Sequence, residues 1–135
     1  MDDIVQGLIK RFKTNDPFII AERLNIHIRY CNLGNSTRGF YYRKLRRRFI
    51  VIHDGLNDPW KRFVCAHELA HDRLHPGISR FYIDEQSFFS AGKFERQANL
   101  FAVKLLMSNT SADPGETKKQ LLQRCSIPIE LHKYL

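Results

Sequence analysis

The sequence lacks any apolar run close to the roughly 20 residues that a membrane-spanning helix requires. Its start, Met1-Asp2-Asp3, is acidic and has neither the basic residues nor the apolar stretch of a secretory signal peptide. Cys31, Cys65 and Cys125 are too far apart to form a C-x-x-C pair, so neither a disulfide framework nor a cysteine zinc site is indicated. These absences predict a cytoplasmic protein without membrane contact.

The chain is too short, at 135 residues, for more than one domain with a substantial hydrophobic core. Hydrophobic residues make up 43% of it, which is typical of a globular protein rather than a disordered one. The sequence shows no repeat and no low-complexity segment. We therefore expect a single domain over residues 1–135, ending in a helical tail at 114–135.

Hydrophobic periodicity predicts an α+β fold. Segments with helical spacing or helix start signals are 3–13, 17–24, 59–74, 94–107, 116–125 and 128–135. Strand-like segments are 26–32, 40–43 and 49–53, with turn signals at Gly34-Asn35 and Arg38-Gly39. We expect a small antiparallel sheet, in an order that the pattern leaves open, and a loop at 76–93.

The strongest chemical signal is an H-E-x-x-H motif at residues 67–71. In a helix, His67 and His71 lie one turn apart on one face and can bind a single metal ion. Glu68 then lies about 100° further round the helix, within reach of a water on that metal. The alternative for this motif is a surface helix with two solvated histidines.

The surroundings of the motif favour a buried metal helix. Asp58 can cap the helix start, Pro59 suits the first turn, and His75-Pro76-Gly77 is a stop signal. Between these signals, apolar residues occur on more than one face of the helix. Buried histidines require polar partners, and a metal ion is one such partner.

A catalytic zinc site usually has three protein ligands. His75 is a poor third ligand, because side chains at i, i+4 and i+8 of one straight helix span about 12 Å, and Asp72 points away from the ligand face. Glu95, near the start of the next helix, is the best candidate. Asn99 lies four residues later on the same face and can accept a hydrogen bond from a ligand histidine.

This set of residues predicts Zn²⁺-assisted hydrolysis, with Glu68 as the proton acceptor. A further donor is needed for the tetrahedral intermediate. Tyr82, His53 and His75 are candidates between which the sequence does not decide. An exposed edge strand, for which 49–53 is a candidate, could hold an extended peptide beside the metal.

Two stretches, 63–71 (FVCAHELAH) and 94–102 (FERQANLFA), resemble the ImmA/IrrE family of metallopeptidases. The resemblance covers about 15–108, which we take as the core of the domain. It implies a zincin-like α+β domain of the gluzincin type. The ligands implied are His67, His71 and Glu95, with Glu68 as the catalytic glutamate. Many members carry Glu where this chain has Gln97, which we expect to lie outside the metal shell.

The resemblance also implies a function. Several members come from phages and integrative elements and cleave a helix-turn-helix transcriptional repressor, and others act in stress responses. We therefore expect a zinc-dependent endopeptidase that cleaves such a repressor and so de-represses a mobile element or stress genes. The sequence leaves the scissile bond, the activating signal and the oligomeric state open.

A basic cluster at residues 43–48 provides much of the formal net charge of +8. It fits either a solvated hairpin tip or a surface that contacts an acidic protein or nucleic acid. Tyr41 and Tyr42, beside the cluster, could stack on bases or could simply be strand residues. The cluster motivates an alternative function, a non-catalytic regulator that binds a repressor or DNA.

Overall fold

The computed structural model describes residues 1–76, 80–84 and 92–135. The helices are α1 (Asp2–Phe12), α2 (Pro17–Arg23), α3 (Asp58–Leu74), α5 (Lys93–Leu106), α6 (Lys118–Arg124) and the 3-10 helix η1 (Ile129–Tyr134). The strands are β1 (Ile26–Cys31), β2 (Thr37–Lys44), β3 (Arg47–His53) and β4 (Arg80–Asp84). None of the helices in these ranges is long and apolar enough to cross a membrane.

The sheet has the order β1-β3-β2-β4 and is mixed rather than antiparallel. β2 pairs antiparallel with β3 and with β4, whereas β1 pairs parallel with β3. The α+β class is therefore confirmed, but the prediction of a purely antiparallel sheet is wrong. The reason is geometric: two chain reversals separate β1 from β3, so the strands run in the same direction once they become neighbours.

Two other sequence predictions fail in the sheet. Residues 80–84, predicted to belong to a loop, form β4 at the edge beside β2; the loop prediction for 77–79 and 85–91 lies outside the described residues. The turn predicted at Arg38-Gly39 is also wrong, because both residues lie within β2. A Cβ on Gly39 would lie 2.5 Å from Cγ1 of Val64 and 2.7 Å from the carbonyl oxygen of Val51. This glycine therefore allows β2 to approach α3 closely.

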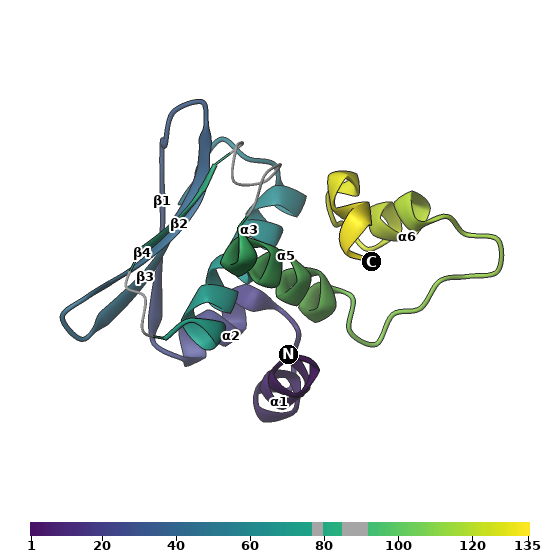
Figure 1. The fold of residues 1–135 in the computed structure, drawn as a ribbon, viewed down its shortest axis with the longest axis horizontal. Coiled ribbons are helices and arrows are strands. Elements are labelled where there is room, and N and C mark those ends of the chain that lie inside the picture. The colour runs from purple at the N-terminus through teal and green to yellow at the C-terminus, as the bar shows by residue number, and fades with distance from the viewer. Residues whose placement is uncertain (77–79, 85–91) are drawn as a thin grey trace.

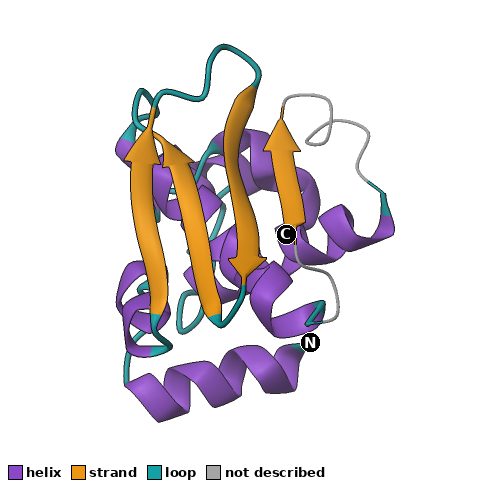
Figure 2. Ribbon diagram, turned by 90° about the vertical axis from the view of Figure 1, so that its left-hand side faces the viewer, coloured by secondary structure: helices purple, strands orange, loops and turns teal. Residues whose placement is uncertain are grey.

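The helices within the described ranges lie on one side of the sheet, as Figures 1 and 2 show. The hydrophobic core lies between the sheet and the helices. There Tyr41, Ile50 and Ile52 of the sheet are buried together with Phe63 and Leu69 of α3. Helix α5 packs against α3. As a result every α3 residue from 63 to 72 is buried, so the H-E-x-x-H motif lies inside the core.

Helix starts are defined by polar side chains. The side chain of Asn57, not the predicted Asp58, caps α3 by accepting a hydrogen bond from the backbone N–H of Trp60 at 3.1 Å. Asp16 caps α2 by accepting from the backbone N–H of Phe18 at 2.9 Å. The C-terminal tail forms the two short helices α6 and η1, and Leu131 of η1 is fully buried in the core.

Candidate active site

Helices α3 and α5 bring three metal-binding groups together. Nε2 of His67 lies 3.2 Å from Nε2 of His71, and each nitrogen lies 2.9 Å from one carboxylate oxygen of Glu95. Both histidines are fully buried, and the Glu95 side chain is 15% exposed. Within the described residues these three side chains are the only His, Cys, Asp or Glu group spaced to hold a metal ion.

The spacing of these atoms fits a small divalent cation. Two ligands at about 2.0–2.1 Å from a tetrahedral zinc ion lie roughly 3.3 Å apart. The observed separations of 2.9–3.2 Å are close to this value. Two imidazole nitrogens and one carboxylate oxygen are also a donor set that zinc accepts in catalytic sites. The residues present therefore fit a metal ion.

Asn99, one turn after Glu95 on α5, contacts the second ring nitrogen of His67. Its Oδ1 lies 2.7 Å from Nδ1 of His67, and its amide nitrogen donates to the hydroxyl oxygen of Tyr134 at 2.9 Å. Because the amide oxygen only accepts, Nδ1 of His67 carries the proton. Nε2 then presents its lone pair toward His71 and Glu95, as metal binding requires.

The second histidine is held by His75, which the sequence offered as a candidate donor for the tetrahedral intermediate, and by Gln97, which it placed outside the metal shell. Nδ1 of His71 lies 3.1 Å from Nδ1 of His75, and Nε2 of His75 lies 2.8 Å from Oε1 of Gln97. Since Gln97 accepts through this oxygen, Nε2 of His75 donates, and its Nδ1 is left to accept from His71. His75 is therefore not the third ligand, but its contact with His71 sets the tautomer of that histidine. The sequence signal for this contact is the position of His75 one helical turn after His71.

Glu68 is fully buried, and neither of its carboxylate oxygens has a hydrogen-bond partner among the described residues. Burial, and then the negative charge of Glu95, raise the pKa of Glu68 well above its ordinary value. Its Oε1 lies 3.8 Å from Nε2 of His67, so the carboxyl group borders the three metal-binding atoms. A buried carboxyl group without partners is costly unless a water or ligand completes its hydrogen bonds.

Glu95 and His71 have protonation states suited to binding a cation. Burial raises the pKa of Glu95, but its hydrogen bonds and charge interactions with the two histidines outweigh burial and lower this pKa to about 2. Burial lowers the pKa of His71 to about 4, against the opposing effect of Glu95. At neutral pH Glu95 is thus an anion and His71 is neutral, which are the forms that bind metal.

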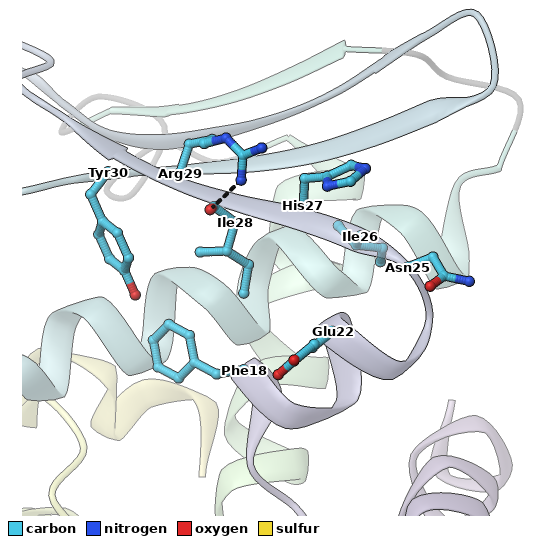
Figure 3. Close-up of a pocket in the computed structure, with 8 residues that line it drawn as sticks. All are labelled: Phe18, Glu22, Asn25, Ile26, His27, Ile28, Arg29 and Tyr30. Carbon is cyan, nitrogen blue, oxygen red and sulfur yellow. Dashed lines mark hydrogen bonds between the residues drawn. The ribbon is translucent and has the colours of Figure 1, made fainter.

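The remaining predicted participants do not gather here. His53 contacts Asp54 and Gly55 at the end of β3, and the side chain of Tyr82 lies outside the described part of the chain. β3 is a central strand paired on both sides, so the prediction that it offers a free edge for a peptide is wrong. A separate pocket between α2 and β1 is shown in Figure 3, and none of His67, His71 and Glu95 lines it.

Comparisons with known proteins agree with the geometry. Residues 21–121 match the family described as IrrE N-terminal-like domain, a peptidase family. The chain is 43% identical over 103 residues to "Uncharacterized immunity region protein 2" of Bacillus phage phi105, a match covering 76% of this chain and 65% of that protein, less than two thirds of its length. It is 29% identical to "Metallopeptidase ImmA" of Bacillus subtilis, over 96% of this chain and 80% of that protein. The chain therefore belongs to the ImmA/IrrE family of metallopeptidases.

Proposed function

We propose that the chain is a zinc-dependent endopeptidase, with His67, His71 and Glu95 as the metal ligands and Glu68 as the general base. The observation that carries this proposal is the fully buried Glu68, whose unpartnered oxygens lie beside the three metal-binding side chains. No packing role explains a carboxyl group in this position. A water molecule held at the metal would give Glu68 its missing hydrogen-bond donor.

Each of the chain's own groups has a distinct task in peptide hydrolysis. Bound zinc supplies a Lewis acid that lowers the pKa of a water molecule and polarises the peptide carbonyl. Glu68 accepts the proton of the attacking water and delivers it to the leaving amine. Burial raises the pKa of Glu68 above its ordinary value, which favours a carboxyl group that can return the proton after accepting it.

Asn99 and His75 position the imidazoles of the two ligand histidines. Asn99 accepts from Nδ1 of His67, and His75 from Nδ1 of His71, so that both Nε2 atoms present lone pairs to the same point. Outer contacts of this kind fix the ring orientation and typically contribute about 10–100-fold in metal affinity. Tyr134 and Gln97, in turn, hold the two positioning side chains.

For the substrate we propose a helix-turn-helix repressor, whose cleavage would de-repress a mobile element or stress genes. The family membership supports this substrate class. So does the similarity to a protein of a phage immunity region. The candidate to test first is the helix-turn-helix protein encoded nearest to this chain. An unrelated unfolded protein serves as the comparison substrate, because comparable cleavage of it would indicate a broad peptidase instead.

The test combines metal analysis with matched variants. Purified protein should contain about one zinc per chain, and Glu68→Gln should keep the metal while cleavage of the repressor falls by about 10²–10⁴-fold. Glu22→Gln makes the same chemical change at an exposed position on α2 and should leave cleavage unchanged. Unaltered cleavage by Glu68→Gln, or a wild-type protein that takes up no zinc when zinc is supplied, would contradict the proposal.

A further inference from the structure

Positive charge is concentrated in the first three strands. Residues 26–53 contain seven arginines and lysines and no aspartate or glutamate, so they carry nearly all of the formal net charge of +8. The basic residues are Arg29, Arg38, Arg43, Lys44, Arg46, Arg47 and Arg48. The protease site uses none of them.

The face of the sheet away from the helices carries a row of aromatic rings. The helices that the structure describes cover only the opposite face, as Figures 1 and 2 show. The pairing register places His27, Phe49 and Tyr42 side by side across β1, β3 and β2. Phe49 stacks on Tyr42 with 4.7 Å between ring centroids, His27 lies 5.2 Å from Phe49, and Phe40 lies 5.7 Å from Tyr42. The row ends in His27, which is exposed on the edge strand.

Cations flank this row on the same face. Lys44 pairs with Arg47 across the hairpin, and strand alternation puts both on the side of Tyr42 and Phe49. Arg29 projects from β1 on the same side as His27, opposite Ile28 and Tyr30, as Figure 3 shows. All three cations are exposed. Like charges directly opposite each other destabilise a sheet, so the fold gains nothing from Lys44 facing Arg47.

Two neighbouring residues have structural roles instead. Arg48 forms an ion pair with Asp72 of α3 at 3.0 Å. Tyr41 is buried and donates its hydroxyl to Asp72 at 2.8 Å. Of the two alternatives that the sequence left for Tyr41, a strand residue is therefore the correct one, and both alternatives stay open for Tyr42. Because Arg48 and Tyr41 form a buried network with Asp72, residues on the outer face of the sheet can be substituted without changing that network.

We propose that the outer face of β1, β3 and β2 binds single-stranded nucleic acid. Unpaired bases present flat faces that stack on aromatic side chains, and a basic groove or rim holds the phosphates. Here a base stacks on His27 and extends the ring row. Lys44 and Arg47 contact phosphates at one end of the row, and Arg29 does so at the other. The absence of any carboxylate in residues 26–53 makes this face complementary to a polyanion.

The test measures fluorescence anisotropy with a labelled 15-nucleotide deoxythymidine strand over a range of salt concentrations. The triple variant Arg29→Ala, Lys44→Ala, Arg47→Ala removes the three proposed phosphate contacts. It should bind more weakly and reduce the slope of log affinity against log salt by about 2, since each phosphate contact contributes roughly 0.7. His27→Leu keeps a side chain of similar size but removes the ring, and should weaken binding by about ten-fold. Because His27 is exposed, this variant is expected to fold normally.

Matched controls separate the outer face from overall charge and from proteolysis. Lys10→Ala, Lys118→Ala, Lys119→Ala removes the same charge from exposed positions on α1 and α6 and should leave the salt slope unchanged. Glu68→Gln should bind the strand like the wild type, because the proposal does not rest on the protease function. The proposal is overturned by equal losses in the two triple variants, by tighter binding of a duplex of equal length, by equally effective competition from polyglutamate, or by no binding at low salt.

Discussion

Replacing Gly39 with alanine is the sharpest test of how the sheet positions the metal-binding helix. The added methyl group would lie 2.5 Å from Cγ1 of Val64 and 2.7 Å from the carbonyl oxygen of Val51. Val64 lies one turn before His67 on α3, so the contact joins β2 directly to the motif helix. The clash involves a backbone atom of the central strand, which no side-chain rotation can relieve.

Overpacking of this kind costs about 1–3 kcal/mol. We expect a value near 2 kcal/mol, because α3 or the strand must shift. For a domain of this size that loss lowers the Tm by about 6–8 °C. Val64→Ala in the same chain should not restore full stability, since the contact with the Val51 oxygen remains.

Gly7→Ala is the matched control. The same methyl group is added to an exposed position of α1 where no atom lies within 4 Å. Alanine is the better helix former, so this variant should gain about 0.5–1 kcal/mol. Both variants are compared by urea unfolding followed by circular dichroism, at fixed zinc concentration. A Gly39→Ala protein as stable as the wild type, or changed in the same direction as Gly7→Ala, would refute the close-packing argument.

Four further predictions concern the site and its surroundings. Tyr41→Phe removes one hydrogen bond to the Asp72 carboxylate, which keeps those from Arg48 and Arg73, and should cost about 1.5–3 kcal/mol in urea unfolding. A loss under about 0.5 kcal/mol would speak against the network. Burial raises the pKa of Asp72, but the hydroxyl of Tyr41 and two arginines outweigh burial and hold this pKa below its ordinary value. The stabilisation from the ionised carboxylate is therefore present above about pH 4 and is lost on further acidification. Asp72→Asn should reduce this loss of stability at acid pH, which urea unfolding at a series of pH values measures. Asn99→Ala and His75→Leu should each weaken zinc binding by about 10–100-fold in competition with a chromophoric chelator, whereas unchanged affinity would remove their positioning role. Removing zinc with a chelator should lower the Tm. Compared with protein in free zinc at about 100 times its Kd, the loss corresponds to about 2.7 kcal/mol of unfolding free energy. A Tm that does not depend on zinc would argue against a site through which zinc binds the folded state alone.

The clustering of His67, His71 and Glu95 could be predicted from sequence because much of its geometry is local. His67 and His71 share a face through helix periodicity alone, and Glu95 and Asn99 do so on the next helix. The long-range step, joining Glu95 to the two histidines, followed from the requirement for a third ligand. The structure places Nε2 of each histidine 2.9 Å from a carboxylate oxygen of Glu95.

The features that sequence did not predict depend on contacts between distant elements. Nothing within 26–32 indicates that this strand pairs in parallel with β3, because alternation reports only which face is buried. β4 was missed because its neighbourhood is rich in aromatic residues and has no clear period. The contact of His75 with Gln97 joins the end of α3 to α5. The sequence could exclude His75 as a metal ligand, but it could not identify Gln97 as its hydrogen-bond partner.

The position of the metal site depends on small residues as much as on its ligands. Helix α3 is buried on both sides, against the sheet at Gly39 and against α5 at Ala98, which is fully buried one residue before Asn99. A larger side chain at either place would separate two elements that the site needs together. Buried interiors transmit such shifts because they are densely packed. The spacing of His67 and His71 therefore indicates a metal site, whereas the close approach of α3 to the sheet and to α5 determines whether Glu95 can reach the two histidines.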